Sequence, residues 1–143
     1  MTEQPKAISP RLSESFKKQT MMQTLGASIM QAGEGFCVIR APILAGMRQQ
    51  HGAGHAGLAF TLGDTAAGYA ALSLMPPGQE VMTVEIKINL LAPAMGEALE
   101  ARGEVVRSGR RLTIVRAEVW AIDGARRKSI ALLQGTMIPV DPA

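Results

Sequence analysis

The sequence predicts an α+β fold in which a curved antiparallel β-sheet wraps around one long apolar helix. Residues 57–75 are almost all small or hydrophobic, and a helix that is apolar all round has to be covered on every side. Four long strand-like segments follow it with only short turns between them, and strands joined in this way pair antiparallel. The simplest architecture is therefore one domain over residues 1–143, in which the sheet covers the helix.

The N-terminal part is predicted to begin with a helix. Residues 1–8 carry no periodic pattern and are expected to be flexible. Ser9-Pro10 has the form of an N-cap followed by a first helical residue, so one helix is predicted from there to about Gly26. Two short strands and a loop rich in Gly, Gln and His are predicted next, at residues 28–32, 35–41 and 42–54.

The apolar helix is predicted to stop at Pro76-Pro77-Gly78, and strands make up the rest of the chain. The strand over residues 81–91 alternates strictly between apolar and polar residues. Its apolar set is expected to face a core and consists of Met82, Val84, Ile86, Ile88 and Leu90. The other strands are predicted at residues 97–107, 111–122 and 128–140, with turns at residues 108–110 and 123–124.

The composition of the 143 residues argues against several classes of protein. Only 3% of residues are aromatic, so despite a net charge of +3 there is no stacking platform for nucleic acid, and no such partner is expected. No segment is a convincing membrane span or signal peptide, which predicts a cytoplasmic protein without a membrane partner. The single cysteine, Cys37, excludes an internal disulfide and is expected to be a buried, inert thiol.

Metal binding is not predicted. His51 and His55 are four residues apart, a spacing that can hold zinc on a helix. Here they lie in a glycine-rich loop, and no third ligand is evident.

Asp64 is the only charged residue between positions 57 and 75. A buried carboxylate is costly unless it is paired, hydrogen-bonded or used in chemistry. A hydrogen bond between Asp64 and a nearby backbone group or Thr65 would be enough to explain a buried carboxylate at this position. The glycine- and histidine-rich segment just before the helix suggests a functional site instead.

Three segments together resemble the hotdog-fold acyl-CoA thioesterases of the phenylacetate-pathway (PaaI-like) group. His55-Ala56-Gly57 followed by Gly63-Asp64-Thr65-Ala66 matches the family's His-Gly-Gly and Ala-Asp-Thr-Ala, with the same spacing between histidine and aspartate. The second segment is the strand over residues 83–90 with Pro93-Ala94 after it, and the third is the hairpin over residues 105–110. The resemblance covers about two-thirds of the chain.

This resemblance implies hydrolysis of an acyl-CoA thioester to a free acid and CoA, with no cofactor beyond the CoA of the substrate. Asp64 would act as general base or nucleophile, the backbone amide of Ala56 would polarise the thioester carbonyl, and His55 would shape the turn. Thr83 stands where a hydroxyl often assists, and Gln49 where the family often has an asparagine. The middle glycine of the family motif is replaced by alanine here, which adds a methyl group beside the acyl carbonyl.

The spacing of the candidate residues along the helix predicts a site that is shared between two subunits. Free amides at a helix N-terminus stabilise an oxyanion, and Ala56 and Gly57 open the helix, with Gly57 leaving the backbone accessible to a ligand. Asp64 follows Ala56 by eight residues, which is about 12 Å along a helix, so the two cannot act on one carbonyl. The Ala56 amide of one subunit is therefore expected to work with Asp64 of another. A homodimer is the minimum, and a homotetramer is compatible.

Arginine-rich turns are candidate contacts for the CoA phosphates, because the planar guanidinium binds phosphate well. The candidates are Gly109, Arg110 and Arg111 at one turn and Arg127 at another. For each of these residues a solvated surface position fits the sequence as well.

Two other functions fit the same fold. A hotdog hydratase or dehydratase would act on acyl thioesters as a lyase, and a non-catalytic protein would only bind acyl-CoA. The context of Asp64 favours the esterase over both. Release of free thiol from an acyl-CoA distinguishes the esterase from the lyase and from the binding protein, because only the esterase produces it.

Overall fold

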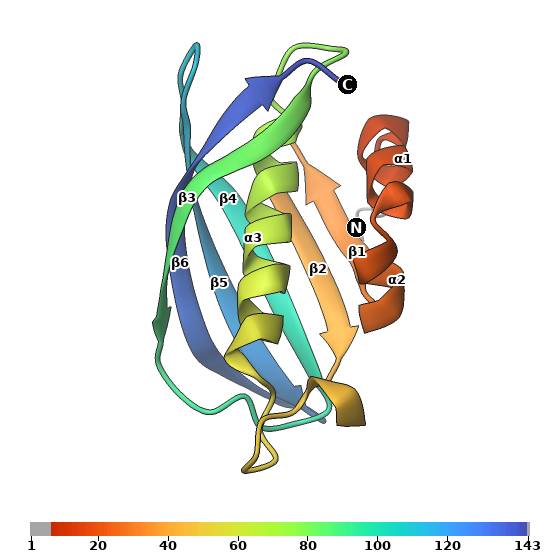
Figure 1. Cartoon of the computed structure of the whole chain (residues 1–143), viewed down its shortest axis with the longest axis vertical. Coiled ribbons are helices and arrows are strands. Elements are labelled where there is room, and N and C mark those ends of the chain that lie inside the picture. The colour runs from red at the N-terminus through yellow and green to blue at the C-terminus, as the bar shows by residue number, and fades with distance from the viewer. Residues whose placement is uncertain (1–6, 143) are drawn as a thin grey trace, which may run out of the picture.

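The computed structural model describes residues 7–142, in which one antiparallel sheet curves around a central helix (Figure 1). The strands are β1 (Ser28–Gly33), β2 (Phe36–Pro42), β3 (Glu80–Leu90), β4 (Ala98–Ser108), β5 (Thr113–Asp123) and β6 (Arg126–Val140). The helices are α1 (Pro10–Lys18), α2 (Thr20–Leu25) and α3 (Ala56–Leu72), with a 3-10 turn η1 (Ala45–Met47). The predicted α+β architecture is confirmed.

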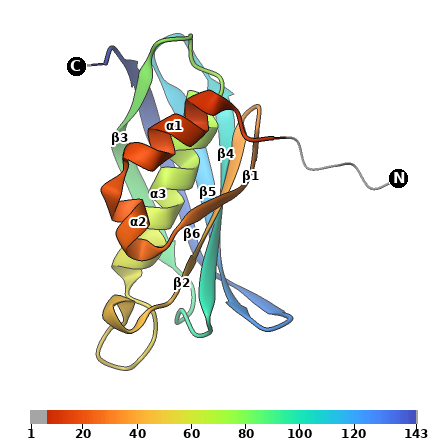
Figure 2. The same ribbon diagram turned by 90° about the vertical axis from the view of Figure 1, so that its right-hand side faces the viewer.

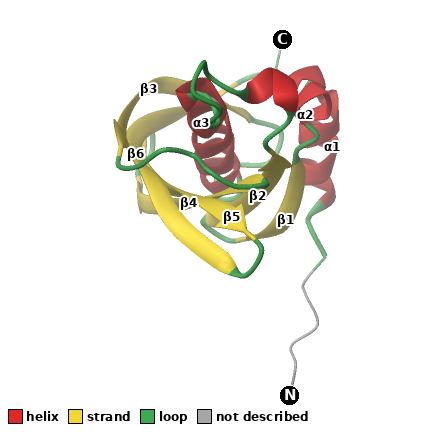
Figure 3. Cartoon of the chain, turned by 90° about the horizontal axis from the view of Figure 1, so that it is seen from below, coloured by secondary structure: helices red, strands yellow, loops and turns green. Residues whose placement is uncertain are grey.

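The order of strands across the sheet is β1-β2-β4-β5-β6-β3, so β1 and β3 form its two edges. Strand β3 follows α3 in the chain but pairs with the last strand, β6, which closes the sheet around the helix. Figure 3 shows this curvature, with α1 and α2 beside α3 on the β1 side of the sheet. The other edge, β3, therefore lies next to a side of α3 that these two helices do not cover.

Helix α3 sits very close to the sheet because β4 has a glycine beneath it. A methyl group at Gly103 would clash with the backbone of Ala66 and Ala67. The second half of α3, residues 66–72, is buried throughout. The core between this half and the sheet contains large fully buried side chains such as Leu72, Leu99 and Val115.

The predicted single N-terminal helix is wrong, because Gln19 is extended (φ −82°, ψ 94°) and separates α1 from α2. The start at Ser9-Pro10 is as predicted, with the Ser9 hydroxyl accepting a hydrogen bond from the N–H of Leu12. The break turns the Gln19 side chain toward α3, where its Nε2 donates to the Tyr69 hydroxyl at 2.7 Å. Figure 2 shows that α1 and α2 lie across α3.

The alternation predicted for β3 is wrong in its first half. A β-bulge at Val84 inserts an extra residue, and a bulge changes which side chains face inward. Downstream of the bulge, Ile86 and Ile88 pack against the core as expected, whereas Leu90 at the end of the strand and Val84 in the bulge are each 56% exposed, contrary to the prediction. Upstream of it, Met82 is 56% exposed and the polar Thr83 takes the inward position.

The remaining boundaries differ from the predictions by at most two residues, apart from the end of α3. That helix ends at Leu72, before the predicted stop at Pro76. The predicted loop over residues 42–54 contains η1. The turn predicted at Asp123-Gly124 lies one residue later, at Gly124-Ala125, because Asp123 ends β5 and pairs with Arg126; Gly124 has a φ of 58°. The prediction for residues 1–8 falls mostly outside the described residues, which begin at position 7.

Candidate active site

Asp64 projects from the middle of α3 and is held by β3. Its Oδ1 accepts a hydrogen bond from the Thr83 hydroxyl at 2.7 Å, so Thr83 rather than Thr65 is its partner. Burial raises the pKa of the Asp64 carboxyl above its ordinary value, and the hydrogen bond from Thr83 works in the opposite direction. The carboxylate is thus half-buried and oriented, and its Oδ2 has no hydrogen-bond partner in the part of the chain that the structure describes.

The Thr83 hydroxyl is itself positioned by β6. The Met137 sulfur lies 3.2 Å from Thr83 Oγ1, and Met137 is the direct register partner of Thr83. A hydroxyl has one proton, and the carboxylate of Asp64 is a stronger acceptor than a thioether. Thr83 therefore donates to Asp64, with the methionine sulfur packed behind it.

A second group of predicted residues lies at the N-terminus of α3. His55 is the N-cap, and its Nδ1 accepts the N–H of Gly57 at 2.8 Å. The N–H of Leu58 donates to the backbone oxygen of His55 at 2.9 Å. The expectation that both Ala56 and Gly57 offer a free amide is therefore wrong: among residues 7–142 only the N–H of Ala56 in this pair lacks an acceptor.

Gly57 has a structural reason of its own. A Cβ at this position would lie 2.9 Å from His55 Nδ1, which is a steric clash. Any other residue at position 57 would therefore push the imidazole away from the N–H that it accepts. The glycine lets the imidazole reach the backbone and cap the helix. In this way His55 and Gly57 together present the Ala56 amide.

Gln49 lies in the loop that leads to His55, and its side chain is used within that loop. Gln49 Oε1 accepts the N–H of His51 at 2.5 Å. The Arg48 guanidinium braces the same loop by donating to Gly52 O at 2.7 Å and to Ile43 O at 3.0 Å. Gln49 is thus left with its amide Nε2 as the group that can contact a ligand.

The predicted catalytic residues form two groups that one chain does not bring together. Asp64 and Thr83 form the first, and the Ala56 amide with His55 and Gly57 forms the second. Eight residues of continuous helix separate Ala56 from Asp64, which is about 12 Å. The distance expected from the sequence therefore holds in the structure.

The predicted phosphate contacts lie at opposite ends of the sheet. Arg110 and Arg111 are exposed in the β4–β5 turn, which is closed by the N–H of Gly109 donating to Leu112 O at 2.8 Å. Arg127, at the start of β6, is paired with Glu100, and its guanidinium stacks 4.3 Å from the Trp120 ring centre. Strand β5 separates the two turns by roughly 30 Å.

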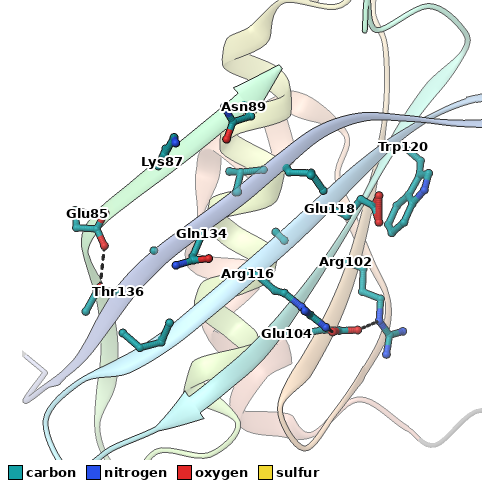
Figure 4. A pocket seen from close by; sticks show the side chains of 15 residues that line it. Glu85, Lys87, Asn89, Arg102, Glu104, Arg116, Glu118, Trp120, Gln134 and Thr136 are labelled. Atoms are coloured by element: carbon teal, nitrogen blue, oxygen red, sulfur yellow. Dashed lines mark hydrogen bonds and ion pairs between the residues drawn. The ribbon is translucent and has the colours of Figure 1, made fainter. Parts of the chain in front are cut away.

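A hollow of about 810 Å³ lies on the other face of the sheet, turned away from α3 (Figure 4). Its carboxylates already have hydrogen-bond partners within the protein. Glu104 is bound by Arg102 at 2.7 Å and by Arg116 at 3.0 Å, which lowers the pKa of its carboxyl. Glu85 accepts from the Thr136 hydroxyl at 2.7 Å. None of the predicted site residues lines this hollow, so we place the candidate site on the α3 side.

The described residues do not favour a thiol nucleophile, a metal site or a membrane-spanning helix. Cys37 is 0% exposed, and burial raises the pKa of its thiol to about 12, so it is the buried, inert thiol that was expected. Within residues 7–142 no group of three or more His, Cys, Asp or Glu side chains is arranged to hold a metal ion. The helices in this range are all too short or too polar to cross a membrane.

The chain belongs to the thioesterase superfamily, whose sequence profile matches residues 51–128, and it is a thioester hydrolase. A thioesterase family protein from Silicibacter pomeroyi superposes with a TM-score of 0.90 at 39% identity, covering 92% of this chain and 97% of that one. The acyl-coenzyme A thioesterase PaaI of Escherichia coli is 29% identical over 121 residues, 84% of this chain and 82% of PaaI. The structure of that PaaI protein superposes with a TM-score of 0.81. The predicted hotdog fold and PaaI-like family are thereby confirmed.

Proposed function

We propose that the protein hydrolyses acyl-CoA thioesters to a carboxylic acid and free CoA at sites shared between two subunits. The main observation is that α3 has a hydrogen-bonded carboxylate, Asp64, about 12 Å from the amide of Ala56, which has no acceptor among residues 7–142. One thioester carbonyl cannot reach both groups in the same chain. It can reach Asp64 of one subunit and Ala56 of the partner subunit when the two helices are antiparallel.

The chemistry then needs only these two groups and water. As the carbonyl carbon is attacked, its oxygen gains negative charge, and the N–H of the partner's Ala56 stabilises that charge. Asp64 either takes a proton from the attacking water or attacks the carbon itself. When Asp64 acts as base, the C–S bond breaks, the acyl carbon keeps the hydroxyl oxygen of the water, and Asp64 passes the water's proton to the CoA sulfur. When Asp64 attacks, the C–S bond breaks to leave an anhydride between the acyl group and Asp64. Water then hydrolyses this anhydride, which supplies the hydroxyl of the acid, restores Asp64 and provides the proton for the CoA thiolate. Thr83 keeps the carboxylate aimed at the substrate.

The second subunit has a natural place at the β3 edge. Strand β3 is 11 residues long, and an edge strand of this length presents unpaired N–H and C=O groups to another chain. Its exposed apolar side chains are Met82, Val84 and Leu90. Antiparallel pairing of two β3 strands would continue the sheet across a two-fold axis, as symmetric dimers require. Because Thr83 lies on β3, this interface adjoins Asp64. A tetramer could be built from two such dimers.

The same dimer accounts for the two arginine-rich turns. One row of register partners crosses the sheet near Asp64 and consists of Thr83, Met137, Thr113 and Ser108. The turn that carries Arg110 and Arg111 is therefore level with Asp64. The β5–β6 turn lies instead at the end of the sheet where α3 begins.

In an antiparallel dimer, the β4–β5 turn of one subunit approaches the β5–β6 turn of the other, at the outer end of each site. Since Arg127 is already paired with Glu100, we assign the CoA phosphates first to Arg110 and Arg111. Gly109 closes the turn that presents them.

A panel of acyl-CoAs with a free-thiol readout tests the proposal on the wild type and on Asp64→Asn. We expect the wild type to release thiol, and Asp64→Asn to lose about 10²–10⁴-fold in kcat, the range for a general base, with CoA binding kept. Equal rates in both proteins would reject the role of Asp64. Binding without thiol release would indicate a non-catalytic binder, and hydration of an enoyl-CoA without thiol release would indicate a lyase.

A further inference from the structure

Helix α3 has one uncovered stripe, and a large aromatic side chain lies at its centre. Ala56, Phe60 and Asp64 are spaced at four-residue intervals, so they follow one another along the same side of the helix. Phe60 is 37% exposed, whereas residues 66–72 are all buried. It is one of only three phenylalanines in the chain. The other large apolar side chains of α3, such as Leu58, Leu62 and Tyr69, are buried, so a partly exposed ring of this size calls for a partner surface.

The proposed dimer determines what that partner is. In a two-fold symmetric pair of antiparallel helices, if residue i contacts residue j then j contacts i. Pairing Ala56 with Asp64 of the partner subunit therefore fixes the register of the two helices, and the one residue that faces its own copy is midway between them, at position 60. Because four residues turn the helix by about 40° beyond one full revolution, Ala56 and Asp64 also lie symmetrically on either side of Phe60.

We propose that the two Phe60 rings of a dimer meet at its two-fold axis and form the common end wall of both acyl pockets. This inference rests on the proposed function. Each thioester carbonyl would lie about one helical turn, roughly 6 Å, from the axis. The arginine-rich turns draw CoA toward the outer end of the site, so the acyl group extends inward. Phe60 is then the large apolar group that stops it, and this residue determines how long an acyl group fits.

Cross-linking tests the position of Phe60 directly. A short bis-maleimide is added to the Phe60→Cys variant, with Ala125→Cys as the control, since Ala125 is exposed in the β5–β6 turn far from the expected axis. The native Cys37 is fully buried and does not interfere. We expect Phe60→Cys to give a covalent dimer at least tenfold faster than Ala125→Cys. If Phe60→Cys cross-links no faster than Ala125→Cys, Phe60 does not lie at the two-fold axis.

A series of acyl-CoAs with acyl groups of increasing length tests whether Phe60 limits the length of the acyl pocket. Each additional buried methylene is worth about fourfold in kcat/KM, the equivalent of ~0.8 kcal/mol. With Phe60→Ala we expect acyl groups two methylenes longer than the wild-type optimum to gain roughly tenfold relative to that optimum. Phe60→Trp should shift the optimum toward shorter groups. An unchanged length profile in both variants would overturn the inference, as would a uniform loss at every length in variants that remain folded dimers by sedimentation.

The two failures can be told apart. If the wild type releases no thiol, or Asp64→Asn is fully active, the proposed function fails. If the wild type is active and Asp64→Asn is not, but the Phe60 variants keep the wild-type length profile, only the role of Phe60 fails.

Discussion

Replacing Ala56 by proline removes the one amide hydrogen that the proposed mechanism needs and disturbs little else. Ala56 is the first residue of α3, a position that proline favours, and its N–H has no acceptor within residues 7–142. The residue before it, His55, has φ −63° and ψ 143°, which is the extended conformation that a residue preceding proline prefers. The folded state therefore tolerates Ala56→Pro, and we expect its stability to stay within about 1 kcal/mol of the wild type.

The catalytic effect should be large by contrast. Loss of one oxyanion donor costs about 10²–10³ in kcat, or ~2.7–4 kcal/mol of transition-state stabilisation. The assay is thiol release from an acyl-CoA at saturating substrate, with thermal unfolding measured in parallel. Ala56→Gly is the matched control, because it keeps the N–H and should stay within a few-fold of wild type. An Ala56→Pro protein that melts like the wild type and keeps more than a tenth of its kcat would refute the role of this amide.

Three further outcomes are expected. Thr83→Val removes the hydrogen bond that lowers the pKa of Asp64, so the acid limb of the kcat/KM profile should move to higher pH; movement to lower pH would contradict this. Burial raises the pKa of Asp64 on folding, so ionisation of this group costs stability above that pKa. Asp64→Asn should therefore raise Tm at pH 7, with a gain that shrinks as pH falls through the raised pKa of the folded state and is absent below the lower pKa of the unfolded chain; a lowered Tm at pH 7 would count against it. Substituting both Arg110 and Arg111 by Gln should raise KM for acyl-CoA about tenfold with little change in kcat, and added salt should shrink the difference, whereas a loss confined to kcat would disprove phosphate binding there.

The sequence was sufficient for the architecture because the strongest signals are local and cumulative. An apolar segment that contains one carboxylate, followed by strands with short turns, fits few folds other than a sheet around a helix. The two errors arose where tertiary contacts override a local pattern. The bulge at Val84 exchanges the inward positions of Met82 and Thr83, and strict alternation gives no sign of it. The break at Gln19 depends on a hydrogen bond to Tyr69, 50 residues further along the chain.

The site was predicted less completely than the fold. The position of Thr83 came from the resemblance to the family, and the structure places its hydroxyl on Asp64. The capture of the Gly57 amide by His55 depends on the orientation of one imidazole ring, which sequence does not specify. Arg127 was a candidate ligand for phosphate but has acquired a partner from a neighbouring strand. Phe60 was overlooked, although its place midway between Ala56 and Asp64 is visible in the sequence.

Mixed oligomers test the sharing of the site between subunits most directly. Ala56→Pro and Asp64→Asn are each expected to be nearly inactive alone, but a mixed dimer contains one site with both an intact Ala56 amide and an intact Asp64. Random reassociation of equal amounts should restore about a quarter of wild-type activity, since half of the dimers are mixed and one of their two sites is complete. Activity that stays at the level of the separate variants, although mixed dimers have formed, would contradict a site built from two chains.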